Sequence, residues 1–103
     1  MSAPSSPYAN LQAEANRQRL KFIKSELALC STFYTIAVQR YELGNQEAAV
    51  KSMDNAEKAY EAVIHFLSDP KHSKHLTFEE TQETRAELEW LRGILDGLRR
   101  FKK

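Results

Sequence analysis

Apolar residues recur every three or four positions along most of this chain, which is the spacing of one face of an α-helix. Three segments carry the pattern, at residues 20–43, 49–67 and 88–98. No segment alternates apolar and polar residues over a useful length, as a half-buried strand would. The pattern therefore predicts an all-α protein.

Glycine, proline and capping residues mark where the predicted helices begin and end. Gly44 suits the left-handed conformation that closes a helix, and Asn45 suits the cap of the next one. Pro70 ends the second helix because the residue before a proline avoids helical angles. Thr77 and Glu80 have the spacing of a capping box. These signals predict helices at about residues 8–43, 46–68 and 78–101.

The first predicted helix carries a second apolar stripe beside its main one, with members seven residues apart. They are Phe22, Leu29, Ile36 and Leu43. The two stripes together cover an arc of roughly 220°, which is wider than one neighbouring helix requires. We therefore expect a three-helix up-down-up bundle with a long first helix, whose residues 9–19 extend past the bundle. A disordered tail at 1–7 and one helical-bundle domain at 8–103 complete the expected organisation.

The hairpin between the first two helices carries a family resemblance. Residues 41–50 read YELGNQEAAV, and Ala49 and Ala56 place two small residues seven apart after a Leu-Gly turn. This resembles the second half of a tetratricopeptide-repeat unit, although the early Trp and closing Pro of that family are not clearly matched. Only one such hairpin is present, whereas a repeat solenoid needs several.

A second resemblance covers about residues 31–101, which are similar to the microtubule-interacting-and-trafficking (MIT) domains. These are three-helix bundles with the same hairpin chemistry. The resemblance implies binding of short helical or extended peptides in grooves between helices. The extended first helix and the segment at 69–76 depart from the family pattern.

Composition agrees with a soluble helical protein. Hydrophobic residues make up 42% and charged residues 28%, and the net charge is +1, so bulk charge indicates no nucleic-acid or membrane partner. No run of 18 apolar residues occurs, and the first seven residues lack the apolar core of a signal peptide. The single cysteine, Cys30, lies on the main apolar stripe. We expect it to be a buried thiol in a cytoplasmic protein.

Two groups of polar residues are candidates for metal binding. His72 and His75 lie near Asp69, but Lys71 and Lys74 between them would repel a cation, which favours a solvated loop. Acidic clusters bind magnesium in some all-α nucleotide hydrolases, and this chain has one at Glu80, Glu83 and Glu87, with Glu26 as the only obvious companion. We favour an ion-paired helix end, because an up-down-up bundle places these acids beside Arg17, Arg19 and Lys21.

No phosphate-binding glycine loop and no supported Ser-His-Asp arrangement is present. We therefore expect no enzyme, no cofactor and no metal. The expected function is a non-enzymatic protein–protein interaction or assembly module that binds a helical segment or a second copy of itself.

The residues expected to bind the partner lie on one edge of the third helix. They are Trp90, Ile94, Gly97 and Phe101. The competing interpretation places Trp90 over a neighbouring helix as the edge of the core. The alternative function is a small nucleic-acid-associated protein that uses a basic end of the bundle. That end comprises Arg17, Arg19, Lys21, Lys24, Lys71 and Lys74.

Overall fold

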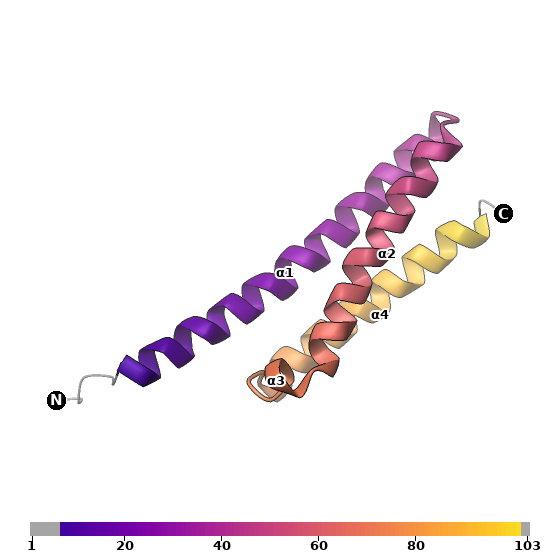
Figure 1. The fold of residues 1–103 in the computed structure, drawn as a ribbon. Coiled ribbons are helices and arrows are strands. Elements are labelled where there is room, and N and C mark those ends of the chain that lie inside the picture. The colour runs from indigo at the N-terminus through magenta and orange to yellow at the C-terminus, as the bar shows by residue number, and fades with distance from the viewer. Residues whose placement is uncertain (1–6, 102–103) are drawn as a thin grey trace.

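The structure, a computed structural model, describes the backbone of residues 7–101 and the side chains of residues 7–100 (Figure 1). Over this range the elements are α1 (Pro7–Glu42), α2 (Gln46–Ser68), α3 (Pro70–Ser73) and α4 (Phe78–Phe101). No strand occurs among the described residues, which confirms the all-α class. The chain runs out along α1, returns along α2 and runs out again along α4, which contacts both.

The start of α1 differs from the expected tail. Pro7 is the first residue of α1, whereas the sequence predicted a tail through residue 7. Proline suits this position because the N–H that it lacks has no partner in the first turn of a helix. The rest of the expected tail, residues 1–6, lies outside the described residues.

The turn between α1 and α2 has the predicted chemistry. Gly44 has φ +79°, the left-handed conformation that favours glycine. The backbone N–H of Asn45 donates to the carbonyl of Arg40 (2.8 Å), which closes α1. The Asn45 side chain then accepts a hydrogen bond from the Ala48 N–H (3.2 Å) and caps α2. The turn therefore folds α2 back against α1.

The link between α2 and α4 contains a helix that the sequence did not predict. Asp69 accepts from the Lys71 N–H (2.9 Å), and Pro70 takes the first position of the one-turn helix α3. The capping box at the start of α4 is confirmed: Thr77 accepts from the Glu80 N–H (3.0 Å), and Glu80 accepts from the Thr77 N–H (2.8 Å). Three local hydrogen bonds thus cap α3 and α4 and fix the reversal of the chain.

Two groups of buried side chains form the core between the helices. The first contains Cys30, Ala37, Met53, Ala56, Ala59, Leu91, Leu95 and Leu98. The second contains Ile23, Val63, Leu67 and Leu88. Leu27 and Tyr60 pack against both groups and join them. Cys30 is 0% exposed, which confirms its predicted place in the core.

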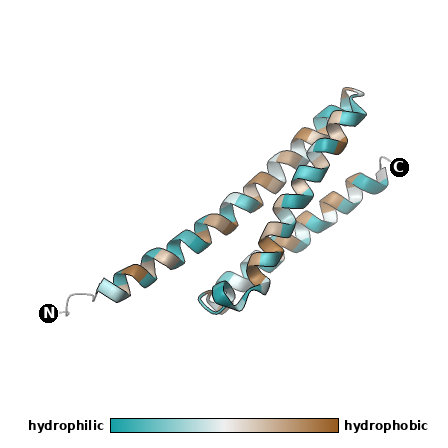
Figure 2. Ribbon diagram, in the orientation of Figure 1, coloured by the Kyte–Doolittle hydropathy of each residue, from teal (hydrophilic) through white to brown (hydrophobic). Residues whose placement is uncertain are grey.

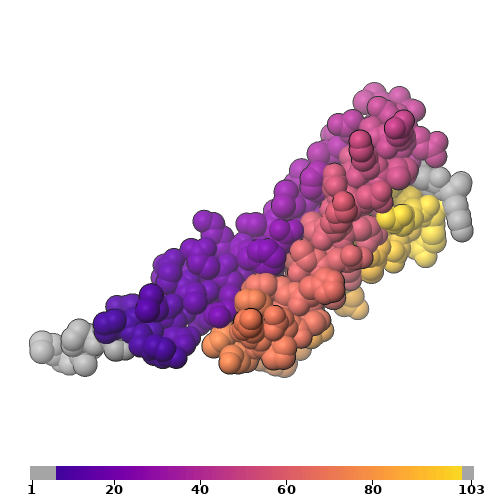
Figure 3. Space-filling view, viewed as in Figure 1, coloured from indigo at the N-terminus to yellow at the C-terminus, as the bar shows by residue number. Residues whose placement is uncertain are grey.

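The first part of α1 extends beyond the other helices (Figures 1 and 3). Tyr8 and Leu11 in this segment are each 70% exposed. Figure 2 shows brown colour within this segment, between teal and pale turns. No helix within the described residues is both long and apolar enough to cross a membrane. The extended segment is therefore an exposed helix that still carries large apolar side chains.

Candidate protein-binding groove

The predicted binding edge lies on α4, and its members differ in exposure. Trp90 is 59% exposed, so more than half of its surface is open to solvent. Ile94 is half-buried and packs against the first core group. A Cβ added at Gly97 would meet no atom within 4 Å, so packing within this chain does not require glycine there. The Phe101 side chain lies outside the described residues.

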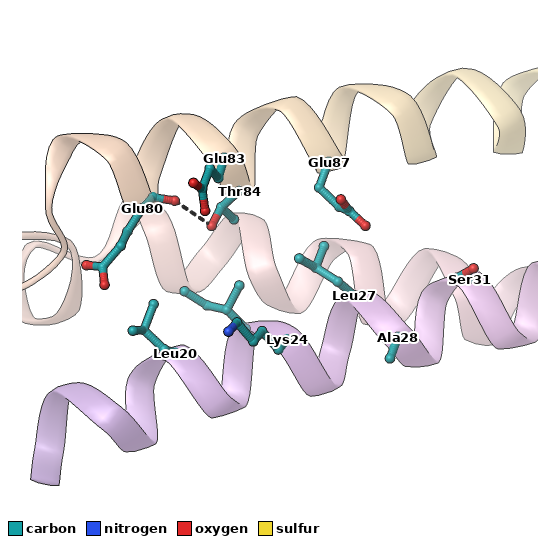
Figure 4. A pocket seen from close by; sticks show the side chains of 10 residues that line it. Leu20, Lys24, Leu27, Ala28, Ser31, Glu80, Glu83, Thr84 and Glu87 are labelled. Atoms are coloured by element: carbon teal, nitrogen blue, oxygen red, sulfur yellow. Dashed lines mark hydrogen bonds between the residues drawn. The ribbon is translucent and has the colours of Figure 1, made fainter.

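A groove between α1 and α4 adjoins this edge, with a volume of about 500 Å³ (Figure 4). Its apolar floor and α1 wall are formed by Leu20, Ile23, Leu27 and Ala28, together with Lys24 and Ser31. Its α4 wall is formed by Glu80, Glu83, Thr84 and Glu87. The groove was not predicted from the sequence. The sequence feature that could have indicated the groove is the pair of small residues, Ala28 and Ser31, which leave space on the α1 face toward α4.

The α4 wall of the groove is acidic and largely unpaired. Glu80 is engaged in the capping box with Thr77. The side chains of Glu83 and Glu87 form no hydrogen bond or ion pair with any other described residue. Lys24 is the one cation among the lining residues. The groove therefore presents two free carboxylates beside an apolar floor.

The expected ion pairs between this acidic cluster and the start of α1 are not formed among the described residues. Arg17 instead pairs with Glu14 one turn earlier on α1. Arg19 donates to the side-chain amide oxygen Oδ1 of Asn16 (2.7 Å) and, through a longer bond of 3.5 Å, to His72 Nδ1. Neighbours three residues apart on one helix are within reach, whereas the acids lie across the groove. This prediction was wrong.

The acidic cluster is also not assembled as a metal site. Glu26, its expected companion, does not line the groove. Within the described part of the chain, no three His, Cys, Asp or Glu side chains are close enough to hold a metal ion. The cluster is therefore better considered as a charged surface than as a ligand set.

A network of ion pairs fastens α4 to α2 on the other side of the molecule. Both nitrogens of the Arg92 fork donate to Glu57, at 2.6 and 2.8 Å, and Arg99 also donates to Glu57 (3.2 Å). Arg92 further pairs with Asp96 (2.8 Å) and lies 4.9 Å from the centre of the Tyr60 ring. The hydrogen bond from Arg92 lowers the pKa of Glu57 below its usual 4.5. This network joins α4 to α2, and none of its residues lines the groove.

The thiol of Cys30 lies beneath this network and is inert as a nucleophile. Burial raises the pKa of Cys30 to about 11, and the charge of Glu57 adds to the rise. A nucleophilic cysteine needs a lowered pKa and an exposed position. Cys30 has neither, and it packs between the helices as a small apolar residue.

The basic residues of the alternative site are brought together only in part. The Arg19–His72 contact joins α1 to α3, and His72 stacks on Phe66 with ring centres 4.2 Å apart. Arg17, Lys21 and Lys24 line a shallow depression on α1 with Leu20, Ser25 and Ala28. The pKa of His75 is lowered, first by desolvation and then by the nearby Arg19, Lys74 and His72. This end of the molecule is therefore locally positive.

Comparison of the chain with models of protein families, with curated protein sequences and with solved structures finds no match.

Proposed function

We propose that this chain is a non-enzymatic protein-interaction module that binds an amphipathic helix carrying lysine or arginine. The observation that carries the proposal is the groove between α1 and α4, whose apolar floor lies beside the unpaired carboxylates of Glu83 and Glu87. The exposed Trp90 continues the same edge. A helix with one apolar face and one basic face is complementary to both features.

The apolar part of the surface supplies the anchor points. Leu20 and Leu27 are half-buried along the groove, so their remaining surface becomes buried when a partner side chain fills the space. Trp90 is a large, exposed aromatic side chain, and tryptophan is among the residues that contribute most at protein interfaces. An apolar face with residues three and four apart fits this layout.

The charges on this surface favour a partner with positively charged residues. Glu83 and Glu87 lie one turn apart on α4 and form no ion pair with the described part of their own chain, although Lys24 lines the same groove. A partner lysine or arginine gains an ion pair with them, whereas an acidic residue is repelled. Because both carboxylates lie near the surface, each pair contributes about 0.5–1 kcal/mol and weakens with added salt.

The length of the edge sets the length of the partner. Glu83, Glu87, Trp90, Ile94 and Gly97 follow one another by four and three residues, so they share one face of α4. This row is about 21 Å long at 1.5 Å per residue. A partner helix of about 14 residues covers it. The open space beside Gly97 allows the partner to approach the α4 backbone.

The proposal is tested with a synthetic helical peptide of about 18 residues, built from leucine on one face and lysine on the other. Binding of a dye-labelled peptide is measured by fluorescence anisotropy at low and high salt. We expect binding by the wild-type chain and about 5–30-fold weaker binding by the double variant Glu83→Gln/Glu87→Gln, since two ion pairs are removed.

The matched control is Glu89→Gln, which removes an exposed carboxylate from another face of α4. We expect less than about a twofold change for this variant, because Glu89 does not line the groove. Equal binding of a peptide with glutamate in place of lysine would contradict the proposal. Equal weakening by Glu89→Gln would contradict it as well.

The interpretation of the fold as a three-helix up-down-up bundle is part of this proposal. In it, α1, α2 and α4 are the three members, and α3 belongs to the link between α2 and α4. The resemblances to tetratricopeptide-repeat hairpins and to MIT domains support the proposal, because MIT domains bind peptides in grooves between helices. We also propose that the protein lies in the cytoplasm, because a chain with a single cysteine forms no disulfide bond within itself.

A second candidate function, binding of nucleic acid, is favoured by the contact between Arg19 and His72. This contact places a basic side chain of α1 beside α3, which carries Lys71 and is followed by Lys74. Phosphate contacts make such binding strongly dependent on salt. Retention on a DNA column that falls with salt, and that is lost in Lys71→Ala/Lys74→Ala, would support it. Retention unchanged in that variant would exclude this surface.

A further inference from the structure

A continuous apolar row runs along the outer side of α1, and we call it the outer row. Its members lie seven residues apart. They are Tyr8, Ala15, Phe22, Leu29 and Ile36, with Leu43 directly after the helix. Tyr8, Leu29 and Leu43 are 70%, 44% and 83% exposed, and Phe22 is 38% exposed. The part of the row from Phe22 onward is predicted from the sequence, and the structure extends the row over the first turns of α1.

The outer row is covered on one side only. Phe22 contacts Phe66 of α2, with ring centres 4.9 Å apart, and Phe33 beside the row packs against the core. These contacts leave the opposite side of the row exposed. The first turns of α1 lie beyond the other helices (Figures 1 and 3). The chain therefore leaves an apolar row the length of its longest helix partly uncovered.

A row with a repeat of seven residues suits a second helix that carries the same row. On a straight helix a row of residues seven apart drifts by only about 20° per step, so two helices that wind slightly around each other can keep two such rows in contact. We propose that α1 pairs in antiparallel orientation with α1 of a second copy of this chain, with the two outer rows in contact. Such a pair is isologous, because the same surface is used by both copies.

The length of the row matches what a stable pair of this type needs. The 36 residues of α1 extend about 54 Å. A contact strip about one helix diameter wide, roughly 10 Å, buries about 540 Å² on each copy. The total of about 1,100 Å² is close to the lower limit for a specific interface. The row suffices only if its whole length is used, including the extended first turns.

The antiparallel orientation follows from the placement of charge. When Phe22 faces Leu29 of the second copy, Tyr8 faces Leu43 and Arg40 faces Leu11. Arg40 then lies within one turn of Glu14 of the second copy, whose carboxylate also contacts Arg17 and Gln18 of its own chain, so opposite charges lie close together there. In a parallel pair each residue faces its own counterpart, so Arg40 faces Arg40. The antiparallel pair also covers the extended segment, which its own chain leaves exposed.

This interface is separate from the groove. Leu20 of the groove and Leu29 of the outer row are nine residues apart, which places them on opposite sides of α1. Pairing through the outer row therefore leaves both grooves open, and it does not depend on the proposed function. A dimer of this kind presents two peptide-binding grooves.

The first test compares two variants in which the replaced side chains are equally exposed to solvent. Leu29 in the outer row and Val50 on α2 are both 44% exposed. Molar mass is measured by light scattering over a concentration series, and circular dichroism checks that the fold is kept. We expect the wild type and Val50→Glu to dimerise. Leu29→Glu raises the dimer dissociation constant by about 100-fold or more, because each dimer would bury two unpaired carboxylates.

A monomeric wild type at every concentration would overturn the proposal. A dimer that is lost in Trp90→Glu but kept in Leu29→Glu would also overturn it, because the α4 edge would then be the interface.

The second test needs no disruption of the interface. Cys30 is buried, so a single engineered cysteine supplies the reactive thiol. In the antiparallel pair Ser25 lies opposite Glu26 of the second copy, next to its own counterpart, whereas Leu11 lies far from its counterpart. We expect Ser25→Cys to form a disulfide-linked dimer under mild oxidation and Leu11→Cys not to do so. The reverse result, or no cross-link in either variant, would refute the antiparallel pairing.

Discussion

Removal of the Glu57 carboxylate is the sharpest test of how α4 is held against α2. Glu57 accepts two hydrogen bonds from Arg92, at 2.6 and 2.8 Å, and one from Arg99, at 3.2 Å. The side chain of Glu57 is 18% exposed and that of Arg92 is 32% exposed. The substitution Glu57→Gln keeps the size and shape of the side chain and removes its charge.

The expected cost follows from this partial burial. A hydrogen bond to a charged group contributes about 1.5–3 kcal/mol, and the exposed third of Arg92 moves the value toward the lower end. Arg92 keeps its contact with Asp96, which limits the loss further. We expect Glu57→Gln to lower the free energy of unfolding by about 1.5–2 kcal/mol. For a chain of this size this corresponds to about 6–15 °C in the melting temperature.

The assay is urea unfolding, followed by circular dichroism, of the wild type, Glu57→Gln, Arg92→Gln and the double variant. The double-mutant cycle isolates the energy of the Glu57–Arg92 pair. Glu61→Gln is the control, because Glu61 is exposed on α2 and forms no ion pair among the described residues. A coupling energy below about 0.5 kcal/mol would refute the assignment, since an exposed pair gives that value.

Three further predictions concern pH, the thiol and the glycines. Because the folded state lowers the pKa of Glu57, this residue stabilises the protein above about pH 4.5, and that stability is lost as the pH falls through the lower pKa of the folded state. Urea unfolding at a series of pH values should therefore show a smaller acid-induced loss of unfolding free energy in Glu57→Gln than in the wild type. The same dependence of unfolding free energy on pH in both proteins would contradict this. With its pKa at about 11, Cys30 should react with a thiol reagent about 100-fold more slowly in the native protein than in urea, and rapid native labelling would contradict its burial. Gly44→Ala should destabilise the protein by about 1–2 kcal/mol, since φ is +79°. Gly97→Ala should stabilise it by about 1 kcal/mol, since nothing lies within 4 Å of the new Cβ. In urea unfolding, a stabilising Gly44→Ala or a destabilising Gly97→Ala would contradict the assignment made for that glycine.

Local chemistry made much of the fold predictable. The bounds of α1, α2 and α4 fall within one residue of those expected, because Gly44, Asn45, Thr77 and Glu80 act on their immediate neighbours. The short helix α3 was missed because Asp69 and Pro70 were interpreted as the end of one helix. The same two residues also start the next one.

The groove and the ion-pair network depend on contacts between distant residues, so the sequence did not reveal them. Glu57 and Arg92 are 35 residues apart, and the rotation of α4 against α2 decides whether they meet. The acids of α4 were expected to find arginines at the start of α1. In the structure, nearby residues on α1 take the place of those acids, as Glu14 does for Arg17. The exposure of Trp90 likewise depended on which face of α4 turned inward.

The most direct test of the proposed function uses the emission of Trp90, because the chain contains no other tryptophan. The leucine–lysine peptide contains none, so the spectrum reports on the α4 edge alone. We predict a saturable blue shift of the emission maximum as peptide is added, since a 59% exposed indole becomes buried. The shift should weaken with salt and in Glu83→Gln/Glu87→Gln. An unchanged emission maximum at peptide concentrations that saturate the anisotropy signal would show that the peptide binds elsewhere and would contradict the proposal.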